Sequence, residues 1–371
     1  MTNKYLVKLT PHDKFFFGGE NTFGEGDSRN YFVKSNYFPQ QTTLLGLIRY
    51  QLLVQSKNGI FKDNKIVSGK EKDVSELIGD SSFNINVAVF QFGQIKEISP
   101  VFIVDSNEDH LFPANKEYQF DFDKGIYAFR EFNKKETNTY SNIYEFKNFI
   151  PYLEDYKAKD GLPDLLINSG RQVFDYSDVF IEQKKIGIRK YYNGKSEENA
   201  FYVQFFYKLK KGHSFAFILE LEDGVKFETN ELVSIGGEQS KFRMDVSEID
   251  LEFDTIIPDY EKSVKSDKIV LVSDAFVSNE IFKDCDFAIT DTFDFRSLRS
   301  SVNTKNYSKL NRDEKVHEGV SKSGKYNFFR KGSVFYGDDI SKITKHFDEK
   351  IAAKGIGYNH YKIVNKKEAK L

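Results

Sequence analysis

The chain has 371 residues, enough for two domains, and its charges nearly cancel, with 54 Lys and Arg against 56 Asp and Glu. A generally basic nucleic-acid-binding protein is therefore excluded, and any such function must come from local basic patches. The single cysteine, Cys285, excludes an intramolecular disulfide and a zinc site built from cysteine pairs. Aromatic residues make up 16% of the chain, which favours β-rich or α+β packing.

The beginning of the chain, MTNKYLVKLTP, lacks the apolar core of a secretion signal. No apolar run is long enough to span a membrane. We therefore expect a soluble cytoplasmic protein without a membrane partner.

The first predicted elements are a strand over Tyr5–Leu9 and a polar, glycine-containing loop over 18–36. A helix follows, and either Thr42 or Thr43 can cap its N-terminus with a hydroxyl group. Apolar residues four positions apart, from Leu44 onwards, give this helix one buried face.

Gly46 and Arg49 lie one turn apart in this helix. Glycine costs a helix roughly 1 kcal/mol relative to alanine, a cost most easily tolerated where another backbone must come close. Free N–H groups, the positive end of the helix dipole and a guanidinium together suit a phosphate. A capped core helix with a solvated arginine explains the same residues, and on these residues alone we prefer it.

The later predicted elements are mostly strands. Strand-like segments are Val87–Phe92, Val101–Val104, Phe201–Leu209, Ser214–Leu221, Lys241–Val246, Ile269–Ser273, Phe287–Thr290, Val334–Tyr336 and Tyr358–Val364, and helical ones are Val74–Ile78, a short helix ending over Glu231–Ile235, and Ile340–Ile351. The pair around the Lys210–His213 turn is predicted to form a hairpin. Residues 130–180 give no clear prediction.

This order of elements fits two copies of the split β-α-β unit. The predicted fold class is α+β, with two ferredoxin-like (RRM-like) domains that carry glycine-rich loops and insertions. We place the first domain, with insertions, at residues 1–211 and the second at residues 212–371.

Charge is unevenly distributed along the chain. Residues 105–123 and 245–261 are acidic, and they either meet partner subunits or keep the chain soluble. Residues 296–331 carry ten Lys or Arg with little apolar content, so we expect a flexible basic arm there.

A double glycine followed by cations lies at the predicted helix-to-strand junction of Ser234–Arg243. Gly236 and Gly237 would let a backbone approach a ligand, while Lys241 and Arg243 would supply positive charge. A glycine helix cap followed by a turn also explains this segment, and for the segment alone we prefer this interpretation.

Gly187 lies between cations in a second segment, with Arg189 and Lys190 directly after it. From Lys184 to Lys211 there are eight basic and two acidic residues, with aromatic residues among them. Cations and aromatic rings together can hold phosphates and stack on bases. A solvated hairpin whose aromatic residues fill the core is an equally good interpretation.

Gly355 and Gly357 form a third glycine segment before the last strand. An isolated G-x-G is more often an ordinary turn. It gains weight here because the other two glycine segments also have basic neighbours.

The sequence predicts no catalytic residue, metal site or cofactor. The six histidines do not pair at a helical metal-ligand spacing, and Cys285 has no evident activating partner. His12 beside Asp13 could act as a general base in an RNA-cleaving site, but a polar residue at a strand end is the commoner case.

Several short segments, in order along nearly the whole chain, resemble the third subunit of the type III-B CRISPR effector (the Cmr complex), a family of the repeat-associated mysterious protein (RAMP) superfamily. They are Leu9–Asp13, Phe15–Gly18, Phe38–Pro39, Thr42–Arg49, Ser99–Phe102, Leu111–Pro113, Ile186–Arg189, Ile235–Glu238 and Gly332–Tyr336. Gln40–Gln41 and Phe335–Tyr336 fit only in part, and residues 130–180 match no segment of the family.

The resemblance implies two ferredoxin-like RAMP domains and a non-catalytic subunit for antiviral defence. Its implied partners are the 5′ handle of the guide RNA, the large polymerase-like subunit and the backbone RAMP subunits. The implied RNA-binding positions, with the cations beside them, are Gly46, Arg49, Gly187, Arg189, Lys190, Gly236, Gly237, Glu238, Lys241, Arg243, Gly355 and Gly357. Two alternatives stay open: a RAMP endoribonuclease that processes precursor guide RNA, and a scaffold that binds only proteins.

Overall fold

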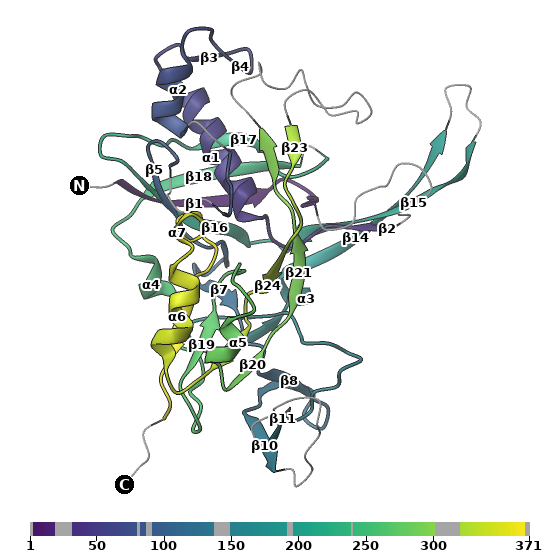
Figure 1. Cartoon of the computed structure of the whole chain (residues 1–371). Helices are drawn as coiled ribbons and strands as arrows, with labels where there is room; N and C mark the ends of the chain where they lie inside the picture. The colour runs from purple at the N-terminus through teal and green to yellow at the C-terminus, as the bar shows by residue number, and fades with distance from the viewer. Residues whose placement is uncertain are drawn as a thin grey trace.

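The computed structural model describes residues 3–18, 32–79, 82–86, 91–136, 149–190, 196–238, 240–300 and 320–367. These residues form a mixed α/β structure in which the sheets are mostly antiparallel (Figure 1). Among them, no helix is long and apolar enough to cross a membrane.

The largest sheet has nine strands and contains the N-terminal strand near its centre. Its order is β13 (Val173–Asp175), β12 (Leu165–Ile167), β7 (His110–Pro113), β6 (Phe102–Val104), β16 (Ser214–Leu221), β1 (Asn3–Pro11), β18 (Lys241–Glu248) and β17 (Asn230–Ser234), and β5 (Ile95–Ile98) also pairs with β16. Alternate residues of β1, such as Val7 and Leu9, are fully buried. The predicted first strand is therefore confirmed, and it forms the centre of this sheet.

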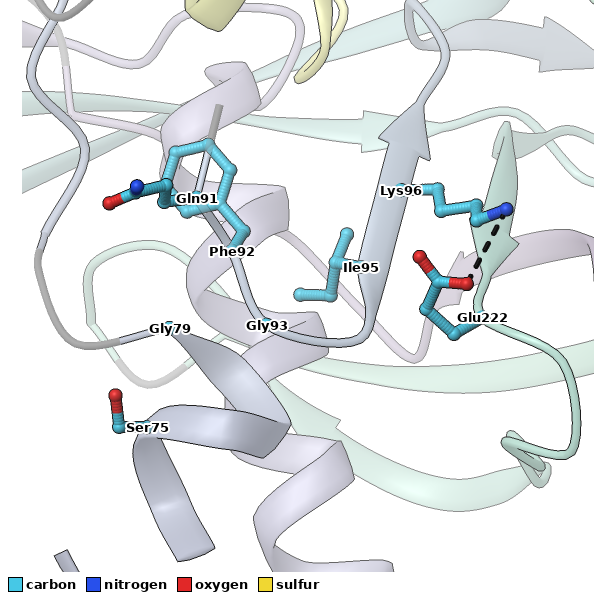
Figure 2. A pocket seen from close by; sticks show the side chains of 8 residues that line it. All are labelled: Ser75, Gly79, Gln91, Phe92, Gly93, Ile95, Lys96 and Glu222. Atoms are coloured by element: carbon cyan, nitrogen blue, oxygen red, sulfur yellow. Dashed lines mark ion pairs between the residues drawn. The ribbon is translucent and has the colours of Figure 1, made fainter. Parts of the chain in front are cut away.

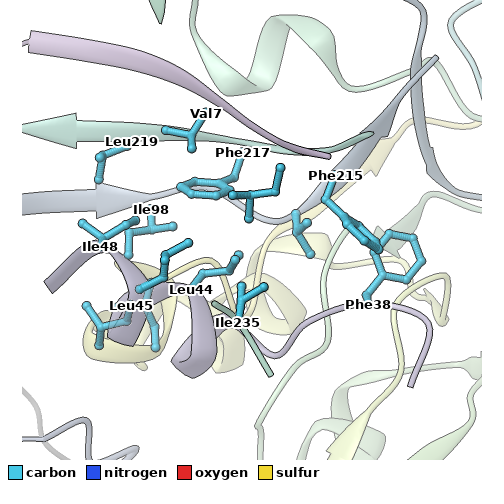
Figure 3. Close-up of a cluster of buried hydrophobic side chains, with 14 of the residues drawn as sticks. Val7, Phe38, Leu44, Leu45, Ile48, Ile98, Phe215, Phe217, Leu219 and Ile235 are labelled. Atoms are coloured by element: carbon cyan, nitrogen blue, oxygen red, sulfur yellow. The ribbon is translucent and has the colours of Figure 1, made fainter. Parts of the chain in front are cut away.

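Helix α1 (Gln41–Gln55) covers this sheet with the predicted apolar face. Figure 3 shows Leu44 and Ile48 directed toward Val7 and Phe217 of the sheet. The predicted threonine cap is wrong, because the N-cap is Gln40, which makes no side-chain cap. Helix α2 (Glu71–Ile78) confirms the second predicted helix.

A three-stranded sheet extends away from the rest of the molecule at the upper right of Figure 1. It consists of β2 (Phe32–Lys34), β14 (Phe180–Lys190) and β15 (Ser196–Leu209), preceded by α3 (Tyr176–Val179), and we call this sheet the arm. β14 and β15 are antiparallel, whereas β2 runs parallel to β15. The predicted hairpin around Lys210–His213 is therefore wrong: its two strands exist but belong to different sheets.

The C-terminal sheet has the order β20 (Phe287–Ile289), β25 (Val334–Tyr336), β19 (Lys268–Leu271) and β26 (Tyr361–Val364), and all its neighbours are antiparallel. Its helices are α5 (Ile281–Asp284), α6 (Ile340–Asp348) and α7 (Ile351–Lys354). Ile343 and Phe347 of α6 are buried in one cluster with Ile269 and Phe335 of the sheet.

The remaining elements are a short helix and five two-stranded sheets. They are α4 (Phe253–Ile256), β3 (Phe61–Lys62) with β4 (Lys65–Ile66), β8 (Tyr118–Asp121) with β9 (Ile126–Phe129), β10 (Phe132–Glu136) with β11 (Phe149–Leu153), β21 (Thr292–Phe295) with β24 (Tyr326–Phe329), and β22 (Leu298–Ser300) with β23 (Val320–Lys322).

Three further predictions need correction. Glu231–Ile235 is not the end of a helix, because Asn230–Ser234 pairs with β18 as a strand. The predicted flexible arm at 296–331 contains β22, β23 and β24, while its residues 301–319 lie outside the described part. In the predicted strand Val87–Phe92, residues 87–90 are likewise not described, and the last two residues are not in a strand.

Buried contacts join the C-terminal sheet to the rest of the chain, and we call the region around two of them the junction. Glu117, after β7, lies with its side chain fully buried, 2.5 Å from the Lys268 ammonium of β19, and also accepts a hydrogen bond from Tyr336. At the second contact, the Gln41 amide donates to the carbonyl oxygens of Ser99 and Gly357, each at 3.2 Å. The start of α1 is thereby fixed against the segment before β26.

Candidate nucleic-acid interface

Gly46 lies on the outer side of α1, and Arg49, one turn later, is partly buried. Gly46 is exposed, and a Cβ atom built there meets no heavy atom within 4 Å. The guanidinium of Arg49 lies 4.7 Å from the centre of the Phe92 ring. The chain's own packing therefore does not require glycine at position 46, which leaves this stretch of backbone open to a ligand.

A cavity of about 580 Å³ lies beside Phe92, between the end of α2 and β5 (Figure 2). Gly79 and Gly93 close one side tightly: a Cβ on Gly93 would lie 2.5 Å from the carbonyl carbon of Leu77. On the other side Lys96 and Glu222 form an ion pair at 3.4 Å. Sequence reasoning missed Phe92 as the residue that positions Arg49, and its only signal was an aromatic residue directly before a glycine.

Gly236 and Gly237 form the turn between β17 and β18. Gly236 has a φ of +78°, and a Cβ there would lie 2.6 Å from the carbonyl oxygen of Phe16. The N–H of Gly237 donates to that same oxygen at 2.8 Å. The chain's own packing thus requires glycine here. Glu238 follows, exposed and with a φ of +56°.

Lys241 and Arg243 extend from the exposed side of β18. Arg243 donates to Asp245 at 2.7 Å, and this carboxylate raises the pKa of the arginine. The Lys241 ammonium donates to the Ser234 hydroxyl at 2.5 Å. The positive charge of Arg243 is therefore balanced by the Asp245 carboxylate, whereas Lys241 contacts a neutral hydroxyl and keeps its positive charge for a ligand.

Gly187 lies within β14 and not in a loop. A Cβ there would lie 2.2 Å from the ring of Tyr202 on β15, so the glycine makes room for the cross-strand tyrosine, which would have to move if position 187 carried a side chain. Arg189 and Lys190 continue β14 past a register shift, and their side chains lie outside the described part.

One face of the arm exposes apolar side chains. Phe32 is 65% exposed, Ile186 62% and Phe201 65%. Phe32 of β2 and Ile186 of β14 both pair with Val203 of β15. Phe201 precedes Val203 by two residues on β15, so the side chains of Phe32, Ile186 and Phe201 share a face. Two lysines accompany them on this face. Lys34 lies 5.9 Å from the Phe205 ring centre and pairs with Glu182 at 2.9 Å, while Lys184, opposite Phe205 on β14, is exposed.

The opposite face of the arm is covered. Val33 and Phe206 are buried there together with Phe16. Phe16 is the residue that also contacts the Gly236–Gly237 turn, so the structure brings this turn and the base of the arm together.

Gly355 and Gly357 lie at the junction. Gly357 is buried with a φ of +92°, and a Cβ there would lie 2.3 Å from the Gln41 amide nitrogen and 2.7 Å from the Ser99 carbonyl oxygen. The Gly355 carbonyl accepts from the N–H of Ile98 at 2.9 Å. This pair is therefore near the start of α1 and is not part of the turn at the base of the arm.

His12, the candidate general base, is exposed, and its Nε2 lies 3.2 Å from the Glu231 carbonyl oxygen. The neighbouring Asp13 pairs with Lys208 at 2.5 Å, and this hydrogen bond lowers the pKa of the carboxyl. Burial raises the pKa of the Cys285 thiol to about 12, so this cysteine is not an activated nucleophile. Among the described residues, no cluster of His, Cys, Asp and Glu could hold a metal ion.

Comparison with solved structures finds similar chains in CRISPR complexes. Two belong to cryo-EM structures of the type III-B Cmr-beta complex, one bound to cognate target RNA and AMPPnP and one bound to cognate target RNA; each is 13% identical with a TM-score of 0.49 and covers 98% of this chain and 99% of that chain. A third, from the crystal structure of the Csm3–Csm4 subcomplex of the type III-A complex, is 11% identical with a TM-score of 0.36 and covers 91% and 94%. Comparison with curated proteins gives no match.

The model of one protein family, described as CRISPR-associated protein (Cas_Cmr3), matches residues 7–364. This range includes every segment on which the resemblance was based, from Leu9–Asp13 to Gly332–Tyr336. The resemblance is therefore confirmed, and the chain belongs to the Cas_Cmr3 family of CRISPR-associated proteins.

Proposed function

We propose that the chain is a non-catalytic, guide-RNA-binding subunit of a type III-B CRISPR effector complex that serves antiviral defence in the cytoplasm. It holds the 5′ handle of the guide RNA and docks on the large polymerase-like subunit beside the backbone RAMP subunits. Family membership supports the assignment to the effector. The observation that carries RNA binding is the exposed face of the arm.

Three large apolar side chains on one narrow face, those of Phe32, Ile186 and Phe201, are not covered by the described residues. Clustered exposed apolar residues commonly mark interaction sites. Phe32 and Phe201 offer flat surfaces to unstacked bases, and the lysines beside them offer charge to phosphates. Stacking of one base on one aromatic side chain contributes about 1–3 kcal/mol, which suits a single-stranded handle.

The predicted RNA-binding residues then divide into two roles. Gly236 and Gly357 shape the backbone, because each has a positive φ and would place a Cβ atom within 2.7 Å of a carbonyl oxygen of the chain. Gly187 and Gly237 instead lie close to the aromatic side chains of Tyr202 and Phe16. Direct contact is left to the exposed backbone at Gly46 and to the side chains of Arg49, Arg189, Lys190, Glu238, Lys241 and Arg243. Gly355 is only partly exposed, and its carbonyl oxygen already accepts from the N–H of Ile98.

We also propose two ferredoxin-like RAMP domains. The succession β19, α5, β20, β25, α6 and β26, with its antiparallel strand order, supports a split β-α-β unit at the C-terminus. The predicted division after residue 211 falls between β15 and β16, yet β16 and β18 pair with β1. A division between β18 and β19 suits this pairing better.

The test uses Phe201→Ala in the assembled complex, with Phe122→Ala as the matched control because Phe122 is 64% exposed in the turn between β8 and β9, away from the arm. We expect Phe201→Ala to weaken binding of the handle RNA about tenfold, since one stacking contact is lost. The affinity of the Phe122→Ala control for the handle RNA should stay within about twofold of that of the parent. Equal RNA retention by parent and Phe201→Ala, together with no crosslink between RNA and the arm, would contradict the proposal.

The endoribonuclease alternative has its own test. Metal-independent cleavage of precursor guide RNA by the purified chain, abolished in His12→Ala, would replace the non-catalytic assignment. We expect no cleavage by either protein, since His12 faces a backbone carbonyl and not a second acid–base group.

A further inference from the structure

The short hairpin of β3 and β4 carries two lysines that face each other. The hairpin follows α1 and lies at the top of Figure 1. Phe61 of β3 pairs with Ile66 of β4. Lys62 pairs directly with Lys65. Because side chains alternate between the two faces of a hairpin, the lysines share one face and the two apolar residues share the other. Neither lysine is among the twelve predicted RNA-binding residues, so the pair is a separate feature of the fold.

The pairing of Lys62 with Lys65 places like charges opposite each other. Directly paired side chains of antiparallel strands have Cβ atoms about 4.5–5.5 Å apart, and like charges at such positions are destabilising. Both lysines are exposed, and among the described residues neither forms an ion pair, not even with Asp63 in the turn between them. The next lysine along the chain, Lys70, does pair with Asp73, at 2.9 Å. The hairpin therefore keeps a repulsion that no described carboxylate relieves.

The backbone of this hairpin is fixed in place. Its two turn residues, Asp63 and Asn64, have φ values of +51° and +58°, and a type I′ turn requires a positive φ at both positions. The Tyr50 hydroxyl of α1 donates to the Asn64 side chain at 2.7 Å. The Tyr50 and Phe61 rings meet edge to face, 5.7 Å apart, and Phe61 and Ile66 pack against the main hydrophobic cluster. Only rotation of the lysine side chains can therefore separate the two charges.

The hairpin is attached to the same side of α1 that exposes Gly46. Tyr50 follows Gly46 by one helical turn, and both residues are exposed. Gly46 offers open backbone, because a Cβ atom built there meets no heavy atom within 4 Å. A strand that contacts α1 at Gly46 therefore reaches the attachment of the hairpin after one turn, about 6 Å along the helix axis.

The chemistry of the pair and of its surroundings selects the ligand. Two ammonium groups on one face suit an anion with several oxygen atoms that both can contact, and lysine commonly binds phosphate as a point charge. A carboxylate of a protein partner carries the same charge. The neighbouring surface of α1 favours a nucleic acid, since the open backbone at Gly46 and the exposed Tyr50 ring suit the backbone and bases of a single strand.

We propose that the β3–β4 hairpin holds one phosphate of the guide RNA between the Lys62 and Lys65 ammonium groups, on a strand that runs along the outer side of α1. This inference rests on the proposed function and extends the RNA-binding surface from the arm and α1 to this hairpin. In the free chain the two charges repel each other, and the bound phosphate removes the repulsion. The pair therefore lowers the stability of the free chain and raises its affinity for RNA.

The experiment compares Lys62→Met and Lys65→Met with the parent, because methionine keeps an unbranched side chain and removes the charge. Affinity for the handle RNA is measured in the assembled complex, at several salt concentrations and with a methylphosphonate at one linkage at a time. Stability is measured by urea denaturation of the full chain. Lys159→Met is the matched control, since this lysine is exposed and forms no ion pair with a described residue. It lies in the segment after β11, at the other end of the molecule in Figure 1.

We expect each hairpin variant to weaken binding of the handle RNA about fivefold to tenfold, since one charge-assisted contact is lost. The slope of log affinity against log salt concentration should become shallower by about 0.7, the value for one phosphate of a single strand. Methylphosphonate at one particular linkage should weaken binding to the parent by a similar factor and add little in either hairpin variant. Lys159→Met should behave as the parent in all three measurements.

The stability of the free chain should change in the opposite direction. Lys62→Met and Lys65→Met each remove the cross-strand repulsion, so both should unfold at a slightly higher urea concentration than the parent. Lys62→Glu places opposite charges across the hairpin, so it should raise the urea midpoint further and weaken RNA binding most. A pair of lysines with a merely structural role would instead lose stability and affinity together.

Three results would overturn the inference while leaving the proposed function intact. The first is RNA binding that Phe201→Ala weakens but neither hairpin variant changes. The second is the absence of any linkage at which methylphosphonate affects the parent more than the hairpin variants. The third is competition by an acidic peptide that both hairpin variants abolish without a change in RNA affinity, which would assign the hairpin to a protein partner. A parent complex that fails to bind the handle RNA would instead remove the proposed function itself.

Discussion

The junction and the outer side of α1 use the same residue type for opposite reasons. At the junction, Gly357 is buried with a φ of +92° and has no room for a Cβ atom. On the outer side of α1, Gly46 is exposed, and a Cβ atom would meet nothing within 4 Å. Internal packing explains the first glycine completely and the second not at all, so only the second is informative about a ligand.

The same contrast holds for side chains. The junction buries a charged pair, Glu117 with Lys268, whereas the arm exposes the apolar residues Phe32, Ile186 and Phe201. Buried charge at the junction is satisfied by its own chain. Exposed apolar surface on the arm is not, which is why the proposed function rests on the arm.

The largest expected effect is at the junction. Lys268→Met should lower the free energy of unfolding by about 3–5 kcal/mol, because it leaves Glu117 buried without its cation. Urea denaturation measures this change. The double variant Glu117→Gln with Lys268→Met should recover much of the loss, and Lys283→Met, which breaks an exposed pair with Glu280, should cost less than about 1 kcal/mol. Equal losses in all three variants would contradict the importance of the buried pair.

Gly357→Ala should follow, with a loss of about 2–4 kcal/mol in the same measurement, since it combines an unfavourable φ with a backbone clash at Ser99. Gly125→Ala is the matched control, because Gly125 has a φ of +67° but open space around it. It should cost about 1 kcal/mol. If the two losses were the same, backbone strain alone would account for the junction glycine.

A smaller, pH-dependent effect is expected at Lys331. Burial lowers the pKa of this lysine from 10.5 to about 7, so between these pH values the unfolded chain binds a proton that the folded chain lacks. The stability of the parent at this group therefore rises with pH in this range. The gain in stability from Lys331→Met should be largest at neutral pH and shrink toward about pH 10, as urea titrations across the range would measure. A gain that does not change with pH would rule out this titration.

Gly46→Ala should have the smallest effect on stability and the opposite sign. Alanine is the better helix former, so the free energy of unfolding should rise by up to about 1 kcal/mol. RNA affinity should fall if the open backbone at Gly46 contacts the guide RNA. A variant that gains stability and keeps full RNA affinity would remove Gly46 from the proposed interface.

Local patterns in the sequence predicted elements but not their partners. The alternation of β1, the apolar face of α1 and the short strand β25 were all visible, because each depends on neighbouring residues only. The hairpin prediction at Lys210–His213 failed because β16 pairs with β1, more than 200 positions earlier in the chain. Residues 130–180 gave no prediction, although they contain β10 to β13. These strands have only three to five residues each, too few to give a clear alternating pattern.

The candidate site shows the same limit. Sequence reasoning selected glycines beside cations. This criterion cannot separate Gly187, which makes room for a cross-strand tyrosine, from Gly46, which no described residue approaches within 4 Å of a Cβ position. Sequence reasoning also assigned no function to Lys62 or Lys65, since their residue type is not unusual. Only the fold shows that these two lysines face each other across a hairpin attached to α1.

The short connection Lys210–His213 attaches the arm rigidly to the nine-stranded sheet. β15 leaves the arm and continues, after this turn, as β16 in the interior of the nine-stranded sheet, and Gly212 packs tightly against Ser106. The orientation of the arm is therefore coupled directly to β16, the strand that pairs with β1. Lengthening this connection would loosen one attachment of the arm, while the hydrogen bonds between Phe15 and Tyr207 and the cluster of Phe16, Val33 and Phe206 would still hold its base.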